Sequence, residues 1–390
     1  MAERKNILFL TSWYPHKGDT TLGIFVKRHA EAVQKNHNIC IIYVRGVLGQ
    51  KNHFESQINS DKGLTEIFVT YRKSTKKFGI GALINWARFY IGHQLGWRAL
   101  KIMKFHPHLI HLNVAFPAGI VAFSWRYWKR LPYIVTEHWT GYLPEDGAYQ
   151  KSMFRRVMTK LIIGDANEVI TVSGGLKEAM RNHGLKNNYT IIPNTVDTNF
   201  FFYNTPIETR KNYFLVVADL VDRQKNISGI ILALSHLYER YPNTQLIIIG
   251  SGKDKEMLIE LAANLNILNN VNFMGVQDPL VVRNYMQEAM ATVLFSHFEN
   301  QPCVIAESFA CGTPVIATDV GGIKEHLLPD MGYLIPTNDS EALLNAMQKI
   351  IRTKPFNPHT IRQYAIDHFS SMKIGAKFDE LYIKHCKIGD

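Results

Sequence analysis

The sequence predicts an α/β protein made of two doubly wound domains that face each other across a cleft. Three observations lead to this prediction. Short, almost continuously apolar segments alternate with amphipathic ones along the 390 residues. Segments of the first kind are typical of parallel strands that are buried on both faces. The alternation weakens between residues 194 and 211, beside Pro193 and Pro206, and then restarts, which indicates a domain boundary.

In the first half, apolar runs predict strands, and apolar residues at helical spacing predict helices. The segment 81–105 places Leu83, Trp86, Tyr90 and Trp97 on one helical face, and Gly184 is a helix stop signal. We expect strands over 6–12, 38–44, 64–71, 108–114, 132–138 and 168–173, and helices over 23–36, 81–105 and 174–183.

The second half repeats this pattern, with expected strands over 212–219, 244–250, 271–275, 291–296 and 313–319 and a helix over 227–241. We therefore predict a first domain over 1–200, a second domain over 201–370, and a C-terminal helix over 371–390 that packs back on the first domain. Open parallel sheets bind ligands at the carboxyl ends of their strands, so the cleft between the domains is the expected site.

The composition and the residue patterns argue against several classes of protein. No apolar run approaches the roughly 18–20 residues that span a bilayer. The apolar stretch from Ile7 to Leu10 is too short for a secretory signal. The four cysteines have no CxxC spacing, which argues against a disulfide framework and a zinc site. We expect a cytoplasmic protein.

The net charge of +11 is concentrated in one stretch. Residues 67–136 contain no Asp or Glu, while the rest of the chain is balanced with 33 basic and 33 acidic residues. Basic residues mixed with Trp suit an anionic membrane surface. A solvated basic face and a nucleic-acid site are the alternatives at this point. The stretch holds Arg72, Lys73, Lys76, Lys77, Arg88, Arg98, Lys101, Lys104, Arg126, Lys129 and Arg130, with Trp86, Trp97, Trp125 and Trp128.

The segment 297–325 carries the most informative pattern, two carboxylates eight residues apart at Glu299 and Glu307. Pro302 suits the first position of a helix, which would leave Glu299 in the preceding loop and Glu307 within the early turns. Free amides at the helix start could bind a phosphate. The pattern would offer one carboxylate to a sugar, amides to a diphosphate and another carboxylate to a ribose, although an isolated pair of this kind also suits a solvated helix face. The amides are those of Cys303, Val304 and Ile305.

This segment resembles the E-x7-E signature of retaining glycosyltransferases of the GT-B fold, the group 1 or family 4 (GT4) type. Further blocks resemble the same family in the same order along the chain: TEHWTGY, VSGGLKEAM, IIPNTVDTNFF and CGTPVIATDVGGIKEHL. The resemblance covers nearly the whole chain and implies two Rossmann-like domains.

The resemblance also implies roles for single residues. Glu299 would hold hydroxyls of the donor sugar, Glu307 would bind the nucleotide ribose, and His138 would lie beside the reaction centre. Lys225 matches the lysine that neutralises the donor diphosphate, where charge develops in the transition state.

Two positions depart from the family pattern. Asp219 stands where an arginine is usual, and Arg223 nearby is a candidate replacement for its charge. Gly23 stands alone before the first helix, where the family usually has a glycine pair near the phosphates. A single glycine still permits close approach of the backbone to a ligand.

The resemblance implies a metal-independent, retaining, hexosyltransferase-type enzyme that needs no cofactor and uses a nucleotide-sugar donor, with a UDP-sugar expected. A saccharide or a polyprenyl-diphosphate-linked saccharide would be the acceptor, in surface polysaccharide biosynthesis at the inner face of the cell membrane. A nucleotide-sugar epimerase of the same fold is the alternative enzyme. A nucleic-acid-binding protein is a third reading, which no helix-turn-helix or RNA-binding signature supports.

Overall fold

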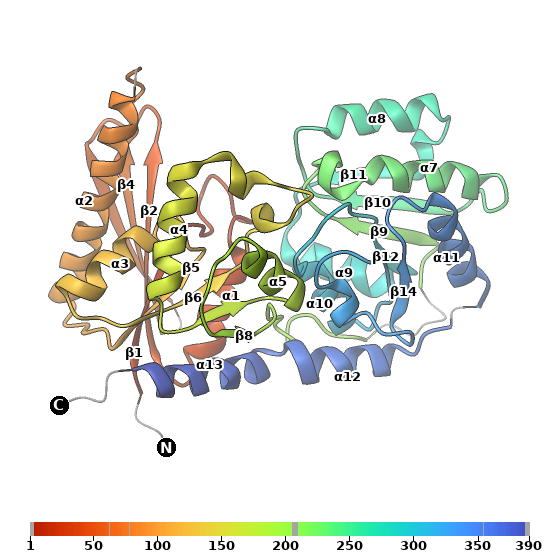
Figure 1. The fold of residues 1–390 in the computed structure, drawn as a ribbon. Helices are drawn as coiled ribbons and strands as arrows, with labels where there is room; N and C mark the ends of the chain where they lie inside the picture. Colours follow the sequence, from red (N-terminus) through yellow and green to blue (C-terminus); the bar gives the residue numbers. More distant parts are fainter. Residues whose placement is uncertain (1–3, 62, 78, 205–209, 354, 387–390) are drawn as a thin grey trace.

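The computed structural model describes all residues except 1–3, 62, 78, 205–209, 354 and 387–390. Two α/β units lie side by side, each built around its own sheet (Figure 1). The predicted α/β architecture with two parallel sheets is therefore confirmed. The predicted boundary at residue 200 falls between the last strand of the first sheet, which ends at Ile191, and the first strand of the second, which begins at Tyr213.

The first sheet has the strand order β3-β4-β2-β1-β5-β6-β7-β8. All neighbours are parallel except β3, which pairs antiparallel with β4 at the edge. Its buried strands are nearly all apolar, which fits a sheet covered on both faces. The strands are β1 (Asn6–Thr11), β2 (Asn38–Val47), β3 (Phe54–Asp61), β4 (Leu64–Arg72), β5 (Leu109–Asn113), β6 (Tyr133–Glu137), β7 (Val169–Thr171) and β8 (Tyr189–Ile191).

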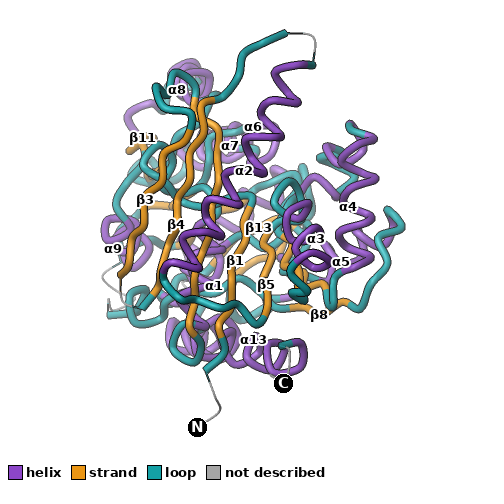
Figure 2. Tube along the Cα trace, turned by 90° about the vertical axis from the view of Figure 1, so that its left-hand side faces the viewer, coloured by secondary structure: helices purple, strands orange, loops and turns teal. Residues whose placement is uncertain are grey.

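Helices cover both faces of this sheet (Figure 2). On one face α1 (Ile24–Val33) packs with the last helix of the chain, α13 (Ser371–His385). On the other face α2 (Ile80–Ile102) packs against β2 and β4, and α3 (Gly119–Trp128) packs against β5 and α4 (Met153–Asp165). The short α5 (Gly174–Asn182) follows β7.

The second sheet is wholly parallel, with the order β11-β10-β9-β12-β13-β14. Its strands are β9 (Tyr213–Val217), β10 (Gln245–Ile249), β11 (Val271–Gly275), β12 (Ala291–Leu294), β13 (Val315–Thr318) and β14 (Gly332–Ile335). Its helices are α6 (Asp222–Lys225), α7 (Ile227–Tyr238), α8 (Lys255–Asn264), α9 (Pro279–Glu288), α10 (Cys303–Ala310), α11 (Ser340–Thr353) and α12 (Pro358–Phe369).

The chain passes between the two units twice, and the two crossings touch. Val196, in the segment after β8, forms a bridge with Ser370 at the junction of α12 and α13, and its amide donates to the Phe369 carbonyl at 2.9 Å. Helix α12 packs on α10, whereas α13 packs on α1 and buries Ile374, Phe378 and Tyr382. The last four residues of the predicted 371–390 helix lie outside the described residues.

The four tryptophans of the basic stretch do not form one exposed set. Trp125 is fully buried against Trp97, whose ring also lies 4.4 Å from the Lys129 ammonium. Trp86 packs among Phe89, Phe116 and Phe154, so only Trp128 of the four is largely exposed, at 76%. Helix α2 also ends at Ile102, before the expected end at residue 105, so Arg98 and Lys101 lie on the helix and Lys104 follows it.

Candidate active site

The predicted site residues gather where strands of the two sheets end. Gly23 follows β1 and His138 follows β6 in the first unit, while Lys225 follows β9 and Glu299 follows β12 in the second. In each sheet the order of the strands changes direction at a central parallel strand. This strand is β1, between β2 and β5, in the first sheet and β9, between β10 and β12, in the second. Such reversal points are the usual ligand sites of doubly wound sheets.

Glu299 and Lys225, 74 residues apart in sequence, form an ion pair. The Lys225 Nζ donates to Glu299 Oε1 at 2.5 Å, and the Ser296 hydroxyl donates to the same oxygen at 2.9 Å. The Glu299 side chain is only 6% exposed, and that of Lys225 is 18% exposed. The carboxylate expected at the donor sugar and the ammonium expected at the diphosphate are therefore direct neighbours.

Helix α10 begins one residue later than the sequence suggests. Pro302 has extended backbone angles and is the N-cap, so Cys303 is the first helical residue. The Ile305 amide donates to the Pro302 carbonyl at 3.2 Å and is not free for a ligand, contrary to our expectation. The amides of Cys303 and Val304 precede the first intrahelical bond and can still bind an anion. Burial raises the pKa of the Cys303 thiol to about 11, so this side chain stays neutral.

Glu307 lies within α10, as predicted, and its partner comes from the other unit. The Arg28 Nη2 of α1 lies 2.5 Å from Glu307 Oε1, and both side chains are largely buried. Burial acts to lower the pKa of Arg28, but the adjacent Glu307 carboxylate raises it overall. The candidate ribose carboxylate is thus held in place by a cation of the first unit.

His138 directly follows β6 and is buried. Its ring stacks on that of Phe25, with 4.1 Å between the ring centroids. Burial holds the pKa of His138 well below its ordinary value, and the neighbouring His29 and His111 lower it further. Its ring is therefore neutral near pH 7 and could serve as a donor or an acceptor but not as a fixed positive charge. Neither ring nitrogen has a partner of ordinary hydrogen-bond geometry among the described residues.

Gly23 caps α1 with φ of 65°, in the left-handed region. A Cβ at this position would lie 2.4 Å from the Trp13 carbonyl oxygen. Both the backbone angle and the close approach require glycine here. The turn before α1 therefore keeps the tight backbone path that the sequence suggests.

Arg223, the candidate replacement for the arginine missing at Asp219, points toward the first unit. Asp219 follows β9, whereas the exposed Arg223 reaches the first unit, where its Nη2 donates to the Glu145 carbonyl at 3.4 Å. Replacement of the missing arginine by Arg223 stays a prediction.

Two further residues join the units at this site and were not anticipated from the sequence. The Asn300 side chain donates to the His138 carbonyl at 2.7 Å, so the loop that carries Glu299 contacts the histidine directly. Glu325 accepts from the amides of Gly174 and Gly175 at 3.0 and 3.1 Å, and so caps α5 of the first unit. Neither pairing has a local spacing that would have revealed it.

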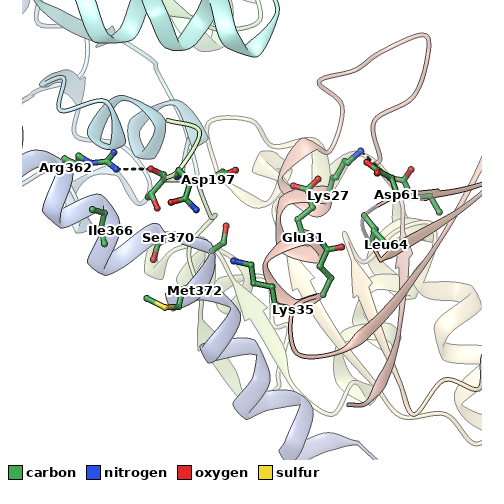
Figure 3. Close-up of a pocket in the computed structure, with 15 residues that line it drawn as sticks. Lys27, Glu31, Lys35, Asp61, Leu64, Asp197, Arg362, Ile366, Ser370 and Met372 are labelled. Carbon is green, nitrogen blue, oxygen red and sulfur yellow. Dashed lines mark hydrogen bonds and ion pairs between the residues drawn. The ribbon is translucent and has the colours of Figure 1, made fainter. Parts of the chain in front are cut away.

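A cavity of about 590 Å³ lies beside the two chain crossings (Figure 3). Lys27, Glu31 and Lys35 of α1 line one side, and Arg362 and Met372 of the last two helices line the other. The Lys27 Nζ lies 3.5 Å from Glu66 Oε1. Neighbouring residues of α1 thus face different surroundings, since Arg28 reaches Glu307 while Lys27 borders this cavity.

The described residues contain neither a candidate metal site nor a candidate membrane-spanning helix. No group of three or more His, Cys, Asp or Glu side chains in the described ranges could hold a metal ion. Within the same ranges, no helix has both the length and the apolar character needed to cross a membrane.

Comparisons with known proteins agree with this geometry. The model of glycosyl transferases group 1 matches residues 197–368, and the model of glycosyltransferase family 4 matches residues 66–200. A Bacillus subtilis glycosyltransferase, TuaC, whose name assigns it to teichuronic acid biosynthesis, is 25% identical over 374 residues, which are 90% of each chain.

Solved structures show the same fold. A sucrose-phosphate synthase of Thermosynechococcus elongatus has a TM-score of 0.77 at 21% identity, covering 97% of this chain and 99% of that one. HepE of Anabaena in complex with UDP has a TM-score of 0.70 at 17% identity, covering 97% and 100%. These structures show that the chain has the GT-B fold. The two family models together cover residues 66–368, so the chain belongs to the group 1, family 4 type of glycosyltransferases.

Proposed function

We propose that this glycosyltransferase moves a sugar from a UDP-sugar to a saccharide or polyprenyl-diphosphate-linked saccharide acceptor, with retention of the anomeric configuration and without a metal ion. The Lys225–Glu299 pair is the observation that carries the proposal. In a nucleotide sugar the reacting carbon is bonded directly to the diphosphate. A residue that holds the sugar and a cation that holds the diphosphate must therefore lie close together, as these two do.

The remaining residues fit one donor molecule. The Cys303 and Val304 amides and Lys225 would stabilise the charge that develops on the leaving diphosphate. Glu307 would accept hydrogen bonds from the ribose hydroxyls. Burial lowers the pKa of His138 and makes its ring a weak base, so the leaving phosphate oxygen would take the proton of the acceptor hydroxyl. Positioning of the acceptor on the same face of the sugar as the leaving group would give retention.

The setting of the reaction is proposed from relatives and from surface chemistry. TuaC is named for teichuronic acid biosynthesis, and HepE has been solved with UDP and with UDP-glucose. These names support a UDP-sugar donor and a role in surface polysaccharide assembly. The acceptor of such a pathway is commonly held at the inner face of the cell membrane, where this chain would act.

A panel of UDP-, GDP-, ADP- and dTDP-sugars tests the donor. A true donor at about 100 times its Kd should stabilise the protein by about 2.7 kcal/mol, which thermal unfolding detects. Transfer to an acceptor, followed by NMR of the product's anomeric proton, tests retention, and the same reaction in a chelator tests metal independence. Absence of stabilisation by every nucleotide sugar would contradict the proposal, and loss of activity in the chelator with rescue by magnesium would contradict the metal-free mechanism.

We also propose that the first unit binds an anionic membrane through the exposed surface of α3 and α4, here called the α3–α4 face. Tyr127 and Trp128 at the end of α3 are exposed at 60% and 76%. Helix α4 adds exposed apolar side chains with exposed basic ones between them. Apolar and aromatic groups at the headgroup level with basic neighbours suit a peripheral membrane contact. The α4 residues are Met153, Phe154, Val157 and Leu161, with Arg156 and Lys160.

We expect the protein to sediment with anionic liposomes, to be released at high salt and to bind neutral liposomes weakly. Each Lys or Arg near an anionic leaflet contributes about 1 kcal/mol, so replacing the exposed Arg156 and Lys160 of the α3–α4 face by Ser should lower binding at least about tenfold. Trp128→Ser with Phe154→Ser should lower it through lost apolar contact. The exposed Lys253 of the second unit provides a control substitution. Equal binding to neutral and anionic vesicles, or none to either, would contradict the proposal.

A further inference from the structure

Arg28 carries a hydrogen-bonding group that the folded chain leaves unused. Its Nη2 is paired with Glu307, but its Nη1 is shielded from solvent and has no hydrogen-bond partner among the described residues. The guanidinium is held in this position by Glu307 and by the Phe201 ring, whose centroid lies 5.9 Å from the Arg28 Cζ. Buried donors of this kind are rare, because an unmade hydrogen bond to a buried polar group is costly. An acceptor is therefore expected at this point when a ligand is bound.

The neighbouring carboxylate restricts the chemistry of that acceptor. A phosphate oxygen could accept from Arg28, but it would be repelled by Glu307 beside it. A hydroxyl group satisfies both residues, since its oxygen accepts from Arg28 while its hydrogen is donated to Glu307. Two adjacent hydroxyls, as in a ribose, would let the guanidinium and the carboxylate engage one ring together. The neutral Cys303 thiol lies beside the guanidinium, but its sulfur is only a weak acceptor and does not replace an oxygen there.

We propose that Arg28 is a second ribose-binding residue of the donor site, supplied by the first unit and acting beside Glu307. This inference rests on the proposed use of a nucleotide-sugar donor. The ribose would then contact both units at once, because α1 provides Arg28 and α10 provides Glu307. Arginine suits this task better than lysine, since its planar fork presents two groups of donors in fixed directions.

The residue before Arg28 gives a matched control. Lys27 lies on the same helix and carries the same charge, but its ammonium is near Glu66 and borders the cavity at the chain crossings (Figure 3). Lys27→Gln therefore removes one positive charge from α1 without removing a group that reaches Glu307. A general effect of charge on the nucleotide would appear in both variants, whereas a specific contact would appear only at Arg28.

The test measures the Kd of UDP, 2′-deoxy-UDP and 3′-deoxy-UDP by calorimetry for the wild-type protein, Arg28→Gln, Arg28→Lys and Lys27→Gln. The wild-type protein should prefer UDP over at least one deoxy analogue by about tenfold or more, the usual scale for a hydrogen bond to a charged group. Arg28→Gln should weaken UDP by a similar factor and lose most of that preference. Lys27→Gln should keep both the affinity and the preference.

The comparison of ribose with deoxyribose separates binding from structural support. If Arg28 only supported the fold, its loss would weaken all three nucleotides equally and leave the preference intact. If Arg28 acted only by positioning Glu307, Arg28→Lys would keep the preference, because its ammonium stays on the Glu307 carboxylate. Arg28→Lys decides the question if Arg28→Gln does not fold, because its single ammonium stays on Glu307 and the preference should still fall. An unchanged preference in either folded variant overturns the inference while leaving the donor proposal standing. Failure of the wild-type protein to bind UDP or any other nucleoside diphosphate would instead contradict the donor proposal itself.

Discussion

Replacing Lys225 by Ala should lower turnover by about 10²-fold or more, the scale expected when one preorganised charge is removed from a developing anion. Lys225 is held by Glu299 at 2.5 Å, so its ammonium needs little rearrangement when the diphosphate leaves. The substitution also strips a largely buried carboxylate of its cation, which adds to the loss. Steady-state kinetics with the donor identified in the panel measure the effect.

A control for Lys225 is available in the same unit. Lys324 is 63% exposed and lies 3.8 Å from Asp319, so Lys324→Ala removes an equal charge away from the Glu299 carboxylate. We expect that variant to keep its turnover. Lys225→Arg should recover part of the activity, because it restores the charge but not the geometry. Normal turnover in a folded Lys225→Ala protein would exclude this residue from the mechanism.

Glu307→Ala should weaken binding of the bare nucleoside diphosphate by about 10- to 100-fold, because charge-assisted hydrogen bonds to the ribose contribute about 1.5–3 kcal/mol each. Removal of the carboxylate also leaves Arg28 buried without its counter-ion. Glu307→Gln is therefore measured as a control for Glu307→Ala, since it keeps the shape of the side chain and removes only its charge. Calorimetry with UDP measures both variants, and their melting temperatures identify any loss of fold.

Glu299→Gln should behave differently from the Glu307 variants. Its expected contact is with the sugar, so the affinity for UDP should be spared while turnover falls. Equal weakening of UDP by the Glu299 and Glu307 substitutions would contradict the division of roles between the two carboxylates.

The strands of both sheets were predictable where their burial leaves a continuous apolar run. Strand β3 was not predicted, because it lies at the edge of the sheet and is mostly exposed. Its sequence FESQINSD therefore carries no apolar run. Helix α4 was also missed, since apolar residues such as Met153 and Phe154 lie on its exposed side and blur the helical pattern.

The candidate site was predictable only in part. Spacing within one segment suggested that Glu299 and Glu307 flank a helix start, and resemblance supplied His138 and Lys225. The contacts of Arg28 with Glu307 and of Glu325 with α5 join residues more than 100 positions apart and on different units. Such pairs depend on how the units are placed, which local periodicity does not encode. The free amide expected at Ile305 was wrong because Pro302, as the N-cap, offers its own carbonyl.

The packing of α13 on the first unit has a consequence for the order of folding during synthesis. Phe378 and Tyr382 of α13 share a core with Ile7 and Phe9 of β1, and the Tyr382 hydroxyl lies 2.7 Å from His111 Nδ1 on β5. Domains usually fold as they leave the ribosome, the N-terminal one first. Here the first unit cannot complete its core until the ribosome has translated the whole second unit and released α13. The nascent first unit must therefore expose part of its apolar surface for most of translation, a period in which a chaperone could bind it.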